Sequence, residues 1–393
     1  MQIDHIDVIH LKFDYPQRHG FRYSGGVCHG RLTSLIAVHT DTGHVGHGAA
    51  YSHPTLVDVI VKQQLEPVLR GEDPRQVEDL WHQMYGLTRW YGRKGVAMTT
   101  IGGLDTAFWD LRGQSLGKPL WSILGGSRDA CPIYASGLLW DAPHELAEEA
   151  AGYIDQGFTR VKMRAARGAE MDRAAVTAVS QAIGPHHNLI VDGSMRYSVE
   201  EARSFANFLA QHDVLWFEEP FAPEDPDSFK ALRGTIKVPV AAGENEFGVQ
   251  GFRELIDGGW VDIVQPDAAR CGGVSEVIKI GHMADERNLR VATHSWSDAI
   301  AITANAHLIA AMPNSITAEM DRTGNPFVDE LLVEPLKIDN GVLKLSGAPG
   351  LGVELSQDVV EEFRFDPYTE LDDGQYSDLA FGKGLFTPAK ANQ

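Results

Sequence analysis

The sequence is poor in cysteine and in positive charge. Its 393 residues include three cysteines, Cys28, Cys131 and Cys271, with no CxxC pair, which predicts neither a disulfide framework nor a zinc ribbon and fits a reducing cytoplasm. Lysine and arginine number 34 against 54 aspartates and glutamates, a formal net charge of −20. This excess of acid argues against nucleic acid or an anionic membrane surface as the main partner.

Long apolar stretches are missing as well. No run approaches the roughly 18 consecutive apolar residues that a membrane-crossing helix needs, so we expect no membrane span. The first residues, MQIDHIDVIHLKF, lack the basic start and apolar core of a signal peptide, and we expect a cytoplasmic protein. With 43% hydrophobic residues, a chain of this length can bury a large core, and we expect two domains.

The second part of the chain repeats one pattern. From about residue 130, short apolar runs recur, each followed by a polar or acidic residue. The eight runs are PIYASG (132–137), TRVKMR (159–164), LIVDGS (189–194), LWFEEP (215–220), PVAAGE (239–244), DIVQPD (262–267), RVATHS (290–295) and SITAEM (315–320). Their length and their Val and Ile content predict buried parallel strands.

Amphipathic stretches separate these runs. One of them, 198–212, opens with Ser198 as N-cap and has Glu201 three residues later, the capping-box pattern of a helix start. Eight strand–helix units in a row predict an α/β fold with a (β/α)8-type, TIM-like barrel. A doubly wound open sheet is the alternative, but the even spacing and the lack of a dinucleotide-binding fingerprint favour the barrel.

The first 125 residues have a different pattern, with strand-like alternation followed by helical stretches. They predict an α+β domain over 1–125 that precedes a barrel over 126–350. The turn-rich and acidic segment 351–393 is expected to pack back against the first domain.

Acidic residues end three neighbouring predicted strands. These are Asp192, Glu218, which Glu219 follows, and Glu244. In a barrel of this type the C-terminal strand ends form the active site, so the three side chains should converge. Each acid alone could cap the helix that follows it. Three converging carboxylates repel one another, however, and an all-oxygen site suits a hard ion, so the pattern predicts a Mg²⁺ site.

The last three strands end in further candidate catalytic groups. Asp267 and His294 end adjacent strands, so the carboxylate could orient the imidazole and raise its basicity, as a general base requires. The chain has 16 histidines, and His294 is distinguished only by its position. Glu319 ends the eighth strand, where a carboxyl held neutral could donate a hydrogen bond to a developing enolate oxygen.

Two cations lie on the second strand. In VKMRAARG (161–168), Lys162 and Arg164 are two positions apart and so share a face. An edge strand would leave both in water, but the neighbouring strand ends at Asp192, so we expect at least one of them to face the site. The layout suggests removal of the α-proton of a carboxylate substrate, with the metal and the cations stabilising the enediolate.

Together these motifs resemble those of the enolase superfamily, specifically its mandelate racemase subgroup. The resemblance covers nearly the whole chain. The motifs are VKMR, VDGS, FEEP, GEN, QPDAARCGG, THS and AEM at the strand ends, and IGGLDTAFWDLRGQSLGKPLWSILGG (101–126) before the barrel.

The resemblance implies a role for each strand-end residue. Asp192, Glu218 and Glu244 would hold Mg²⁺, His294 oriented by Asp267 would be the general base, and Lys162 and Glu319 would contact the substrate. The first domain resembles the family's capping domain, whose loops, here 15–30 and 49–54, close over the barrel. In the first loop His19, Arg22 and Tyr23 are candidate substrate-binding residues, because a polyhydroxy acid would use such groups; a solvated polar loop is an equal alternative.

The sequence departs from the subgroup at one position. Racemases of this subgroup have Lys-x-Lys on the second strand, whereas here Arg164 follows Lys162. A guanidinium is a poor base, so Arg164 is expected to act as an electrostatic partner. This favours a one-base mechanism, in which His294 takes the α-proton and the β-hydroxyl leaves. The expected reaction is dehydration of a sugar acid, an aldonate or aldarate, to a 2-keto-3-deoxy acid.

Two other kinds of function stay open, and a third lacks its motif. An epimerase, racemase or lactone cycloisomerase could use the same scaffold, and a non-catalytic sugar-acid binder could keep the fold, although the complete set of ligands argues against it. A zinc hydrolase would need an HxH motif on the first strand, which PIYASG lacks. The expected partner is a small carboxylate substrate, and the family resemblance implies a homo-oligomer.

Overall fold

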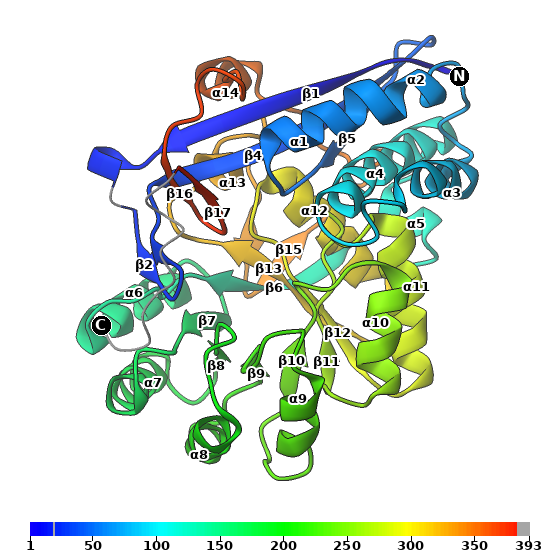
Figure 1. Ribbon diagram of the computed structural model, residues 1–393. Helices are drawn as coiled ribbons and strands as arrows, with labels where there is room; N and C mark the ends of the chain where they lie inside the picture. Colours follow the sequence, from blue (N-terminus) through cyan, green and yellow to red (C-terminus); the bar gives the residue numbers. More distant parts are fainter. Residues whose placement is uncertain (19, 383–393) are drawn as a thin grey trace.

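The computed structural model describes residues 1–18 and 20–382, and its centre is a closed barrel (Figure 1). Within these residues eight parallel strands pair in chain order, and the last pairs with the first through Ala318 and Ile133. The strands are β6 (Ala130–Ser136), β7 (Arg160–Arg164), β8 (Asn188–Asp192), β9 (Phe217–Glu218), β10 (Val240–Ala242), β11 (Ile263–Val264), β12 (Arg290–Thr293) and β13 (Ser315–Asp321). Each overlaps a predicted run, so the barrel prediction is confirmed.

Strand alternation decides which side chains enter the barrel. A buried apolar cluster lies inside the ring of strands, formed by Tyr134, Ile190, Trp216, Ala241, Ile263 and Ala292. A residue two positions later shares the same face and lies nearer to the C-terminal rim. Asp192 follows Ile190 and Glu218 follows Trp216 in this way. The alternation that fills the barrel therefore also places carboxylates at its mouth.

Helices alternate with the strands and cover the outside of the barrel (Figure 1). They are α6 (Pro143–Asp155), α7 (Ala169–Ile183), α8 (Val199–Leu209), α9 (Pro226–Leu232), α10 (Gly248–Asp257), α11 (Val274–Glu286), α12 (Ala299–Ala311) and the short α13 (Pro326–Asp329). The predicted capping box starts α8: Ser198 Oγ accepts the Glu201 N–H at 3.3 Å, and Glu201 Oε2 accepts the Ser198 N–H at 3.0 Å. In the described part of the chain, no helix is both long and apolar enough to cross a membrane.

A three-stranded antiparallel sheet and a layer of helices precede the barrel. The sheet has the order β1 (Ile3–Asp14), β4 (Gly30–Thr40) and β5 (Val45–Ala49). The helices are α1 (Pro54–Val59), α2 (Glu66–Leu69), α3 (Val77–Thr88), α4 (Val96–Leu116) and α5 (Leu120–Ile123), and a wider π-type turn, Ile60–Leu65, joins the first two. The packing of β5 on α4 needs glycine, because a Cβ on Gly48 would lie 2.0 Å from the Gly103 carbonyl oxygen.

The chain returns to this sheet after the barrel. The remaining elements are the hairpin β2 (Arg22–Tyr23) and β3 (Gly26–Val27), the strands β14 (Ile338–Asp339) and β15 (Val342–Lys344), helix α14 (Gln357–Phe363), and the C-terminal hairpin β16 (Gly374–Tyr376) and β17 (Leu379–Phe381). In the C-terminal hairpin the Gln375 N–H donates to His29 Nδ1 at 2.8 Å, and the Tyr376 hydroxyl donates to Asp14 at 3.1 Å. The domain limits at 125 and 350 stay a prediction.

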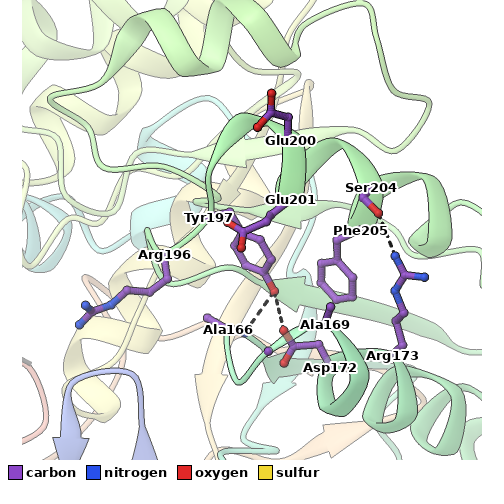
Figure 2. A pocket seen from close by; sticks show the side chains of 11 residues that line it. Ala166, Ala169, Asp172, Arg173, Arg196, Tyr197, Glu200, Glu201, Ser204 and Phe205 are labelled. Atoms are coloured by element: carbon purple, nitrogen blue, oxygen red, sulfur yellow. Dashed lines mark hydrogen bonds between the residues drawn. The ribbon is translucent and has the colours of Figure 1, made fainter. Parts of the chain in front are cut away.

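The loop that follows β7 is held from outside the barrel, beside the pocket shown in Figure 2. The Tyr197 hydroxyl donates to Asp172 Oδ2 at 2.9 Å and accepts the Ala166 N–H at 3.2 Å. Asp172 also accepts the Arg167 N–H at 2.9 Å. Ala166 has a φ of 66°, a left-handed conformation that residues other than glycine seldom adopt. These contacts fix the backbone just beyond Arg164.

One buried ion pair joins the first sheet to the barrel. Arg31 Nη2, on β4, lies 2.5 Å from Asp321 Oδ2 at the end of β13 and also donates to the Trp296 carbonyl oxygen. The two charged side chains are 2% and 0% exposed. Asn325 Nδ2 donates to the same Asp321 oxygen at 2.9 Å. Removing the guanidinium would leave a buried carboxylate without a counter-charge.

We predict that Arg31→Met lowers the free energy of unfolding by about 3–5 kcal/mol, the usual cost of a buried charge that loses its partner. Urea denaturation followed by circular dichroism measures the loss. The control is Arg75→Met, which breaks the exposed pair with Asp73 and should leave the free energy of unfolding nearly unchanged. Equal losses in the two variants would contradict the role assigned to Arg31.

Candidate active site

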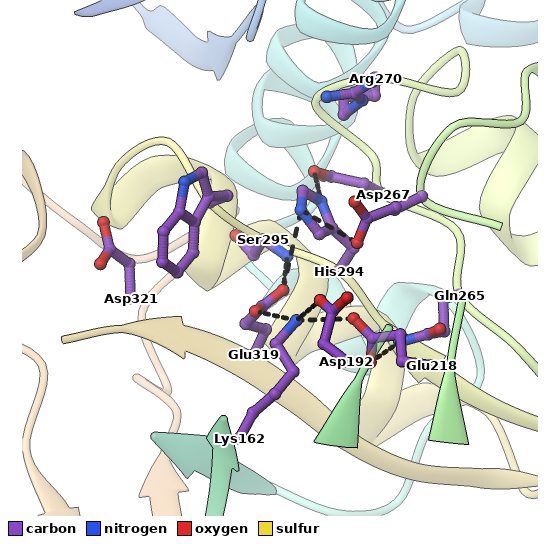
Figure 3. A network of polar contacts seen from close by, with 12 residues as sticks. Lys162, Asp192, Glu218, Gln265, Asp267, Arg270, His294, Ser295, Glu319 and Asp321 are labelled. Carbon is purple, nitrogen blue, oxygen red and sulfur yellow. Dashed lines mark hydrogen bonds and ion pairs between the residues drawn. The ribbon is translucent and has the colours of Figure 1, made fainter. Parts of the chain in front are cut away.

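The predicted charged residues converge at the C-terminal rim of the barrel. Figure 3 shows Lys162, Asp192, Glu218, His294 and Glu319 pointing toward one another from different strands. Each of the five is at most 1% exposed. Lys162 is therefore no part of a solvated edge strand.

Three carboxylates at this rim could hold a metal ion. Asp192, Glu218 and Glu244 each offer an oxygen, and these oxygens lie within 4.8 Å of one another. Glu244 Oε2 is buried without a hydrogen-bond partner among the described residues. Burial raises the pKa of Asp192 to about 7, and the two neighbouring carboxylates act in the same direction, against the lowering effect of Arg164. Both observations indicate uncompensated negative charge at this point.

The charges at the rim suit a divalent cation. We call Asp192, Glu218, Glu244, Glu319, Lys162 and Arg164 the rim cluster. Its four carboxylates stand against two cations, which leaves two negative charges when all six side chains are ionised. Oxygen ligands are those that Mg²⁺ prefers. The residues present therefore fit a Mg²⁺ ion bound by Asp192, Glu218 and Glu244.

The two β7 cations are held by these carboxylates. Lys162 Nζ lies 2.7 Å from Glu218 Oε1 and 2.6 Å from Glu319 Oε1. Arg164 Nη1 lies 2.5 Å from Asp192 Oδ2. Burial disfavours the charged forms, but Glu218 and Glu319 raise the pKa of Lys162 above its ordinary value, and Asp192 does the same for the pKa of Arg164. Both side chains are therefore protonated.

His294 and Asp267 form the predicted hydrogen-bonded pair. His294 Nδ1 lies 2.8 Å from Asp267 Oδ2, and His294 Nε2 lies 3.8 Å from both Glu244 Oε2 and Glu319 Oε2. Burial lowers the pKa of His294, but Glu244, Glu319 and the bond to Asp267 outweigh it and raise this pKa to about 9. A divalent cation beside Glu244 would offset that carboxylate and lower the pKa of His294 again.

Asn305, on α12, supports this pair and was not predicted from the sequence. Its Nδ2 donates to Asp267 Oδ1 at 2.9 Å and to the His294 carbonyl oxygen at 3.2 Å. Its Oδ1 accepts the Ala268 N–H at 3.1 Å. Asn305 is fully buried, so it connects both members of the pair to a rigid helix. The only signal in the sequence is one amide within the apolar stretch AIAITANAHLIAA.

The surroundings of Glu319 favour its ionised form over the neutral carboxyl expected from the sequence. Burial raises the pKa of Glu319, but Lys162 and His294 outweigh it and lower this pKa to about 2. Glu319 Oε2 also accepts the Ser295 N–H at 3.0 Å. The physical reason is the ammonium of Lys162, which makes Glu319 an ionised acceptor rather than a donor.

Of the candidate substrate-binding residues of the first loop, the structure describes Arg22 and Tyr23, and neither contacts the carboxylates. His19 lies outside the described residues. The Tyr23 hydroxyl donates to the Ser377 carbonyl oxygen at 2.5 Å, so it is engaged by the C-terminal hairpin. Arg22 is exposed and lines an outer pocket beside Trp140. Among the described residues, no hydrogen bond or ion pair joins either side chain to the rim cluster.

Arg270 lies above the His294–Asp267 pair (Figure 3). No role was predicted for this residue from the sequence. Its Nη2 donates to Asn245 Oδ1 at 3.1 Å, its guanidinium lies 5.6 Å from the centre of the Tyr51 ring, and its Nη1 lies 4.0 Å from Asp378 Oδ2. The loop 49–54 and the turn of the C-terminal hairpin therefore meet this arginine at the barrel mouth.

Comparisons with known proteins agree with this fold. The family model for the mandelate racemase / muconate lactonizing enzyme N-terminal domain matches residues 6–125, and the enolase C-terminal domain-like model matches residues 145–359. The chain belongs to this family of the enolase superfamily, as its motifs predicted.

Related proteins include both dehydratases and isomerases. The chain is 36% identical to a D-galactarolactone cycloisomerase from Agrobacterium fabrum, over 85% of this chain and 92% of that protein. It is 33% identical to an arabinonate dehydratase from Saccharolobus solfataricus, over 83% of this chain and 89% of that protein. A racemase structure from Streptomyces coelicolor A3(2) with bound magnesium has a TM-score of 0.85 and 25% identity, over 92% of this chain and 100% of that one.

We predict that Mg²⁺ binds more tightly as the pH rises through about 7, because a proton on Asp192 competes with the cation. Titration calorimetry of the metal-free protein should give an affinity about tenfold weaker at pH 6 than at pH 8, as follows from a ligand with this pKa. Asp192→Asn should bind weakly at both values, whereas the exposed control Glu200→Gln should match the parent. An affinity in the parent that does not change between the two pH values would contradict this account.

Proposed function

We propose that the protein is a Mg²⁺-dependent lyase that dehydrates a sugar acid, an aldonate or aldarate, to a 2-keto-3-deoxy acid. Dehydratases among its relatives support the substrate class. The rim cluster supports the binding of a carboxylate next to a metal ion. A single base on one side of the site supports elimination rather than racemisation.

The placement of that base is the observation that carries the proposal. His294 follows β12, whereas Lys162 and Arg164 lie on β7, which is not a neighbour of β12 in the barrel. Both β7 side chains are ion-paired and protonated, so neither is a ready acceptor for a proton. A racemase needs an acceptor on each face of the α-carbon, while an elimination needs only one.

In the proposed reaction, neutral His294 takes the α-proton through Nε2, while Asp267 keeps the proton on Nδ1 and stabilises the imidazolium. The electron pair of the broken C–H bond forms an enediolate on the substrate carboxylate. Its collapse breaks the β-carbon–oxygen bond, and the hydroxide takes the proton back from His294 and leaves as water. The remaining enol then tautomerises to the 2-keto acid.

The rim cluster provides the positive charge that this intermediate needs. The ammonium of Lys162 would contact a substrate carboxylate, and Arg164 favours the ionised form of Asp192 and holds it in position. Mg²⁺, held by Asp192, Glu218 and Glu244, would supply further positive charge to stabilise the developing negative charge. Glu319 orients Lys162 and accepts the Ser295 N–H, so it serves as an acceptor within this network.

A library of aldonates and aldarates tests the proposal. With Mg²⁺ present, at least one member should give a 2-keto-3-deoxy acid, detected by its semicarbazone absorbance. His294→Asn should lower kcat by about 10²–10⁴-fold, the usual contribution of a general base. The exposed histidine variant His186→Asn is the matched control and should keep the parent rate. If no aldonate or aldarate gives a product, the proposal is wrong.

A cycloisomerase acting on a lactone or anhydro sugar acid is the second candidate. Relatives with such names, one of them 36% identical, favour it. The same single base would serve, because the leaving oxygen is then part of a ring and stays attached to the product. Mass spectrometry separates the two reactions: dehydration gives a product lighter by one water, whereas cycloisomerisation conserves the mass.

We predict that Arg164→Lys introduces exchange of the α-proton on the second face, because an amine can release the proton that a guanidinium keeps. Proton NMR in D₂O should then show substrate with an inverted α-centre, which the parent does not form. The exchange should persist in Arg164→Lys/His294→Asn, and Arg167→Lys should behave like the parent. If Arg164→Lys gives no inverted substrate and the double variant no exchange, the reason given for one-base chemistry would lose its support.

A further inference from the structure

A second group of possible metal ligands lies on the first sheet, far from the rim cluster in the sequence. Among the described residues, two groups of His, Asp or Glu side chains bring three ligand atoms close enough for one ion: the rim carboxylates, and His5, Asp7 and His39. The ligand atoms of this second group lie within 4.8 Å of one another. In Figure 1 they belong to the N-terminal end of β1 and the adjoining end of β4, away from the strands of the barrel.

The strand register brings these three side chains together. His5 on β1 pairs with His39 on β4, and Asp7 lies two positions after His5, so the three share one face of the sheet. The two imidazole rings are stacked, with centroids 4.2 Å apart. Asp7 Oδ2 lies 3.2 Å from His39 Nε2 and 3.9 Å from His5 Nε2. Asp7 Oδ2 thus faces the Nε2 atom of each ring.

A fourth residue orients the first imidazole. His5 Nδ1 lies 2.9 Å from Asp4 Oδ2, so the proton of a neutral ring is held on Nδ1 and the lone pair lies on Nε2. This carboxylate–histidine contact is the arrangement that commonly supports a metal-binding imidazole. It directs the free nitrogen of His5 toward Asp7 and His39.

We propose that His5, Asp7 and His39 form a second metal site, for a divalent ion of the zinc, nickel or copper class. Imidazole nitrogen is a preferred ligand of these ions, whereas Mg²⁺ prefers oxygen. Tetrahedral zinc ligands at about 2.0–2.1 Å from the ion lie about 3.3 Å apart. The two imidazole rings must leave their stacked arrangement so that both Nε2 lone pairs point at the ion. Three protein ligands leave one position for water.

The site is accessible and would join two strands. The side chains of His5, Asp7 and His39 are 42%, 53% and 31% exposed, so an ion can enter from solvent. A bound ion would connect β1 to β4 and stabilise the folded state in proportion to its occupancy. This second metal site has no part in the proposed dehydration. Its test is therefore independent of the proposed function.

Copper EPR of the tag-free full-length protein tests the site directly. One equivalent of Cu²⁺, added with excess Mg²⁺ to occupy the rim carboxylates, should show nitrogen hyperfine coupling from two imidazoles. The coupling should persist in His294→Asn, which removes the imidazole beside Glu244. It should disappear in His5→Ala/His39→Ala, and the control His44→Ala, on the turn between β4 and β5, should keep it.

Zinc titration gives a second readout. In excess Mg²⁺ the parent should bind one Zn²⁺ with an affinity at least tenfold above that of His5→Ala/His39→Ala, and only the parent should gain thermal stability from zinc. The single variant Asp4→Asn should bind more weakly than the parent and more tightly than the double variant. Nitrogen coupling that survives in the folded double variant, or equal zinc affinities in the two proteins, would overturn the proposal.

Discussion

The structure depends on holding several carboxylates of like charge close together at a buried site. Asp192, Glu218, Glu244 and Glu319 meet at the barrel mouth, where water is largely excluded and their repulsion is much stronger than on the surface. Lys162 lies between two of these carboxylates, and a guanidinium meets a third. Burial, together with the negative charge that remains, raises the pKa of Asp192, and this charge makes a divalent cation the natural complement of the site.

The barrel and the rim could be predicted from the sequence because both follow from local patterns. Each predicted run contributes one parallel strand, and parallel strands end at the same rim, so an acid at the end of a run must lie near its neighbours. Because side chains alternate between the two faces of a strand, the face that each residue occupies also follows from the sequence. Glu218 shares the inward face of Trp216, two positions before it. The protonation state of Glu319 did not follow, because it depends on the distance to Lys162 rather than on position along a strand.

Contacts between distant segments could not be predicted. Asn305 reaches the His294–Asp267 pair from a helix whose apolar sequence predicts only burial. Arg270 meets the turn of the C-terminal hairpin, more than a hundred residues later in the chain, and no periodic pattern connects the two. Tyr23 illustrates the same limit, because its hydroxyl bonds to that hairpin instead of to the rim. The contacts at the barrel mouth are thus made by segments whose pairing appears only in the folded chain.

The proposed reaction has one central requirement: a single base, His294, exchanges the α-proton from one face of the substrate. The most direct measurement is to incubate a substrate in D₂O, stop the reaction early and examine the recovered substrate by NMR. We predict deuterium at the α-carbon, if any is incorporated, with the original configuration retained, and none in His294→Asn. Recovered substrate with an inverted α-centre, or exchange that persists in His294→Asn, would contradict the claim.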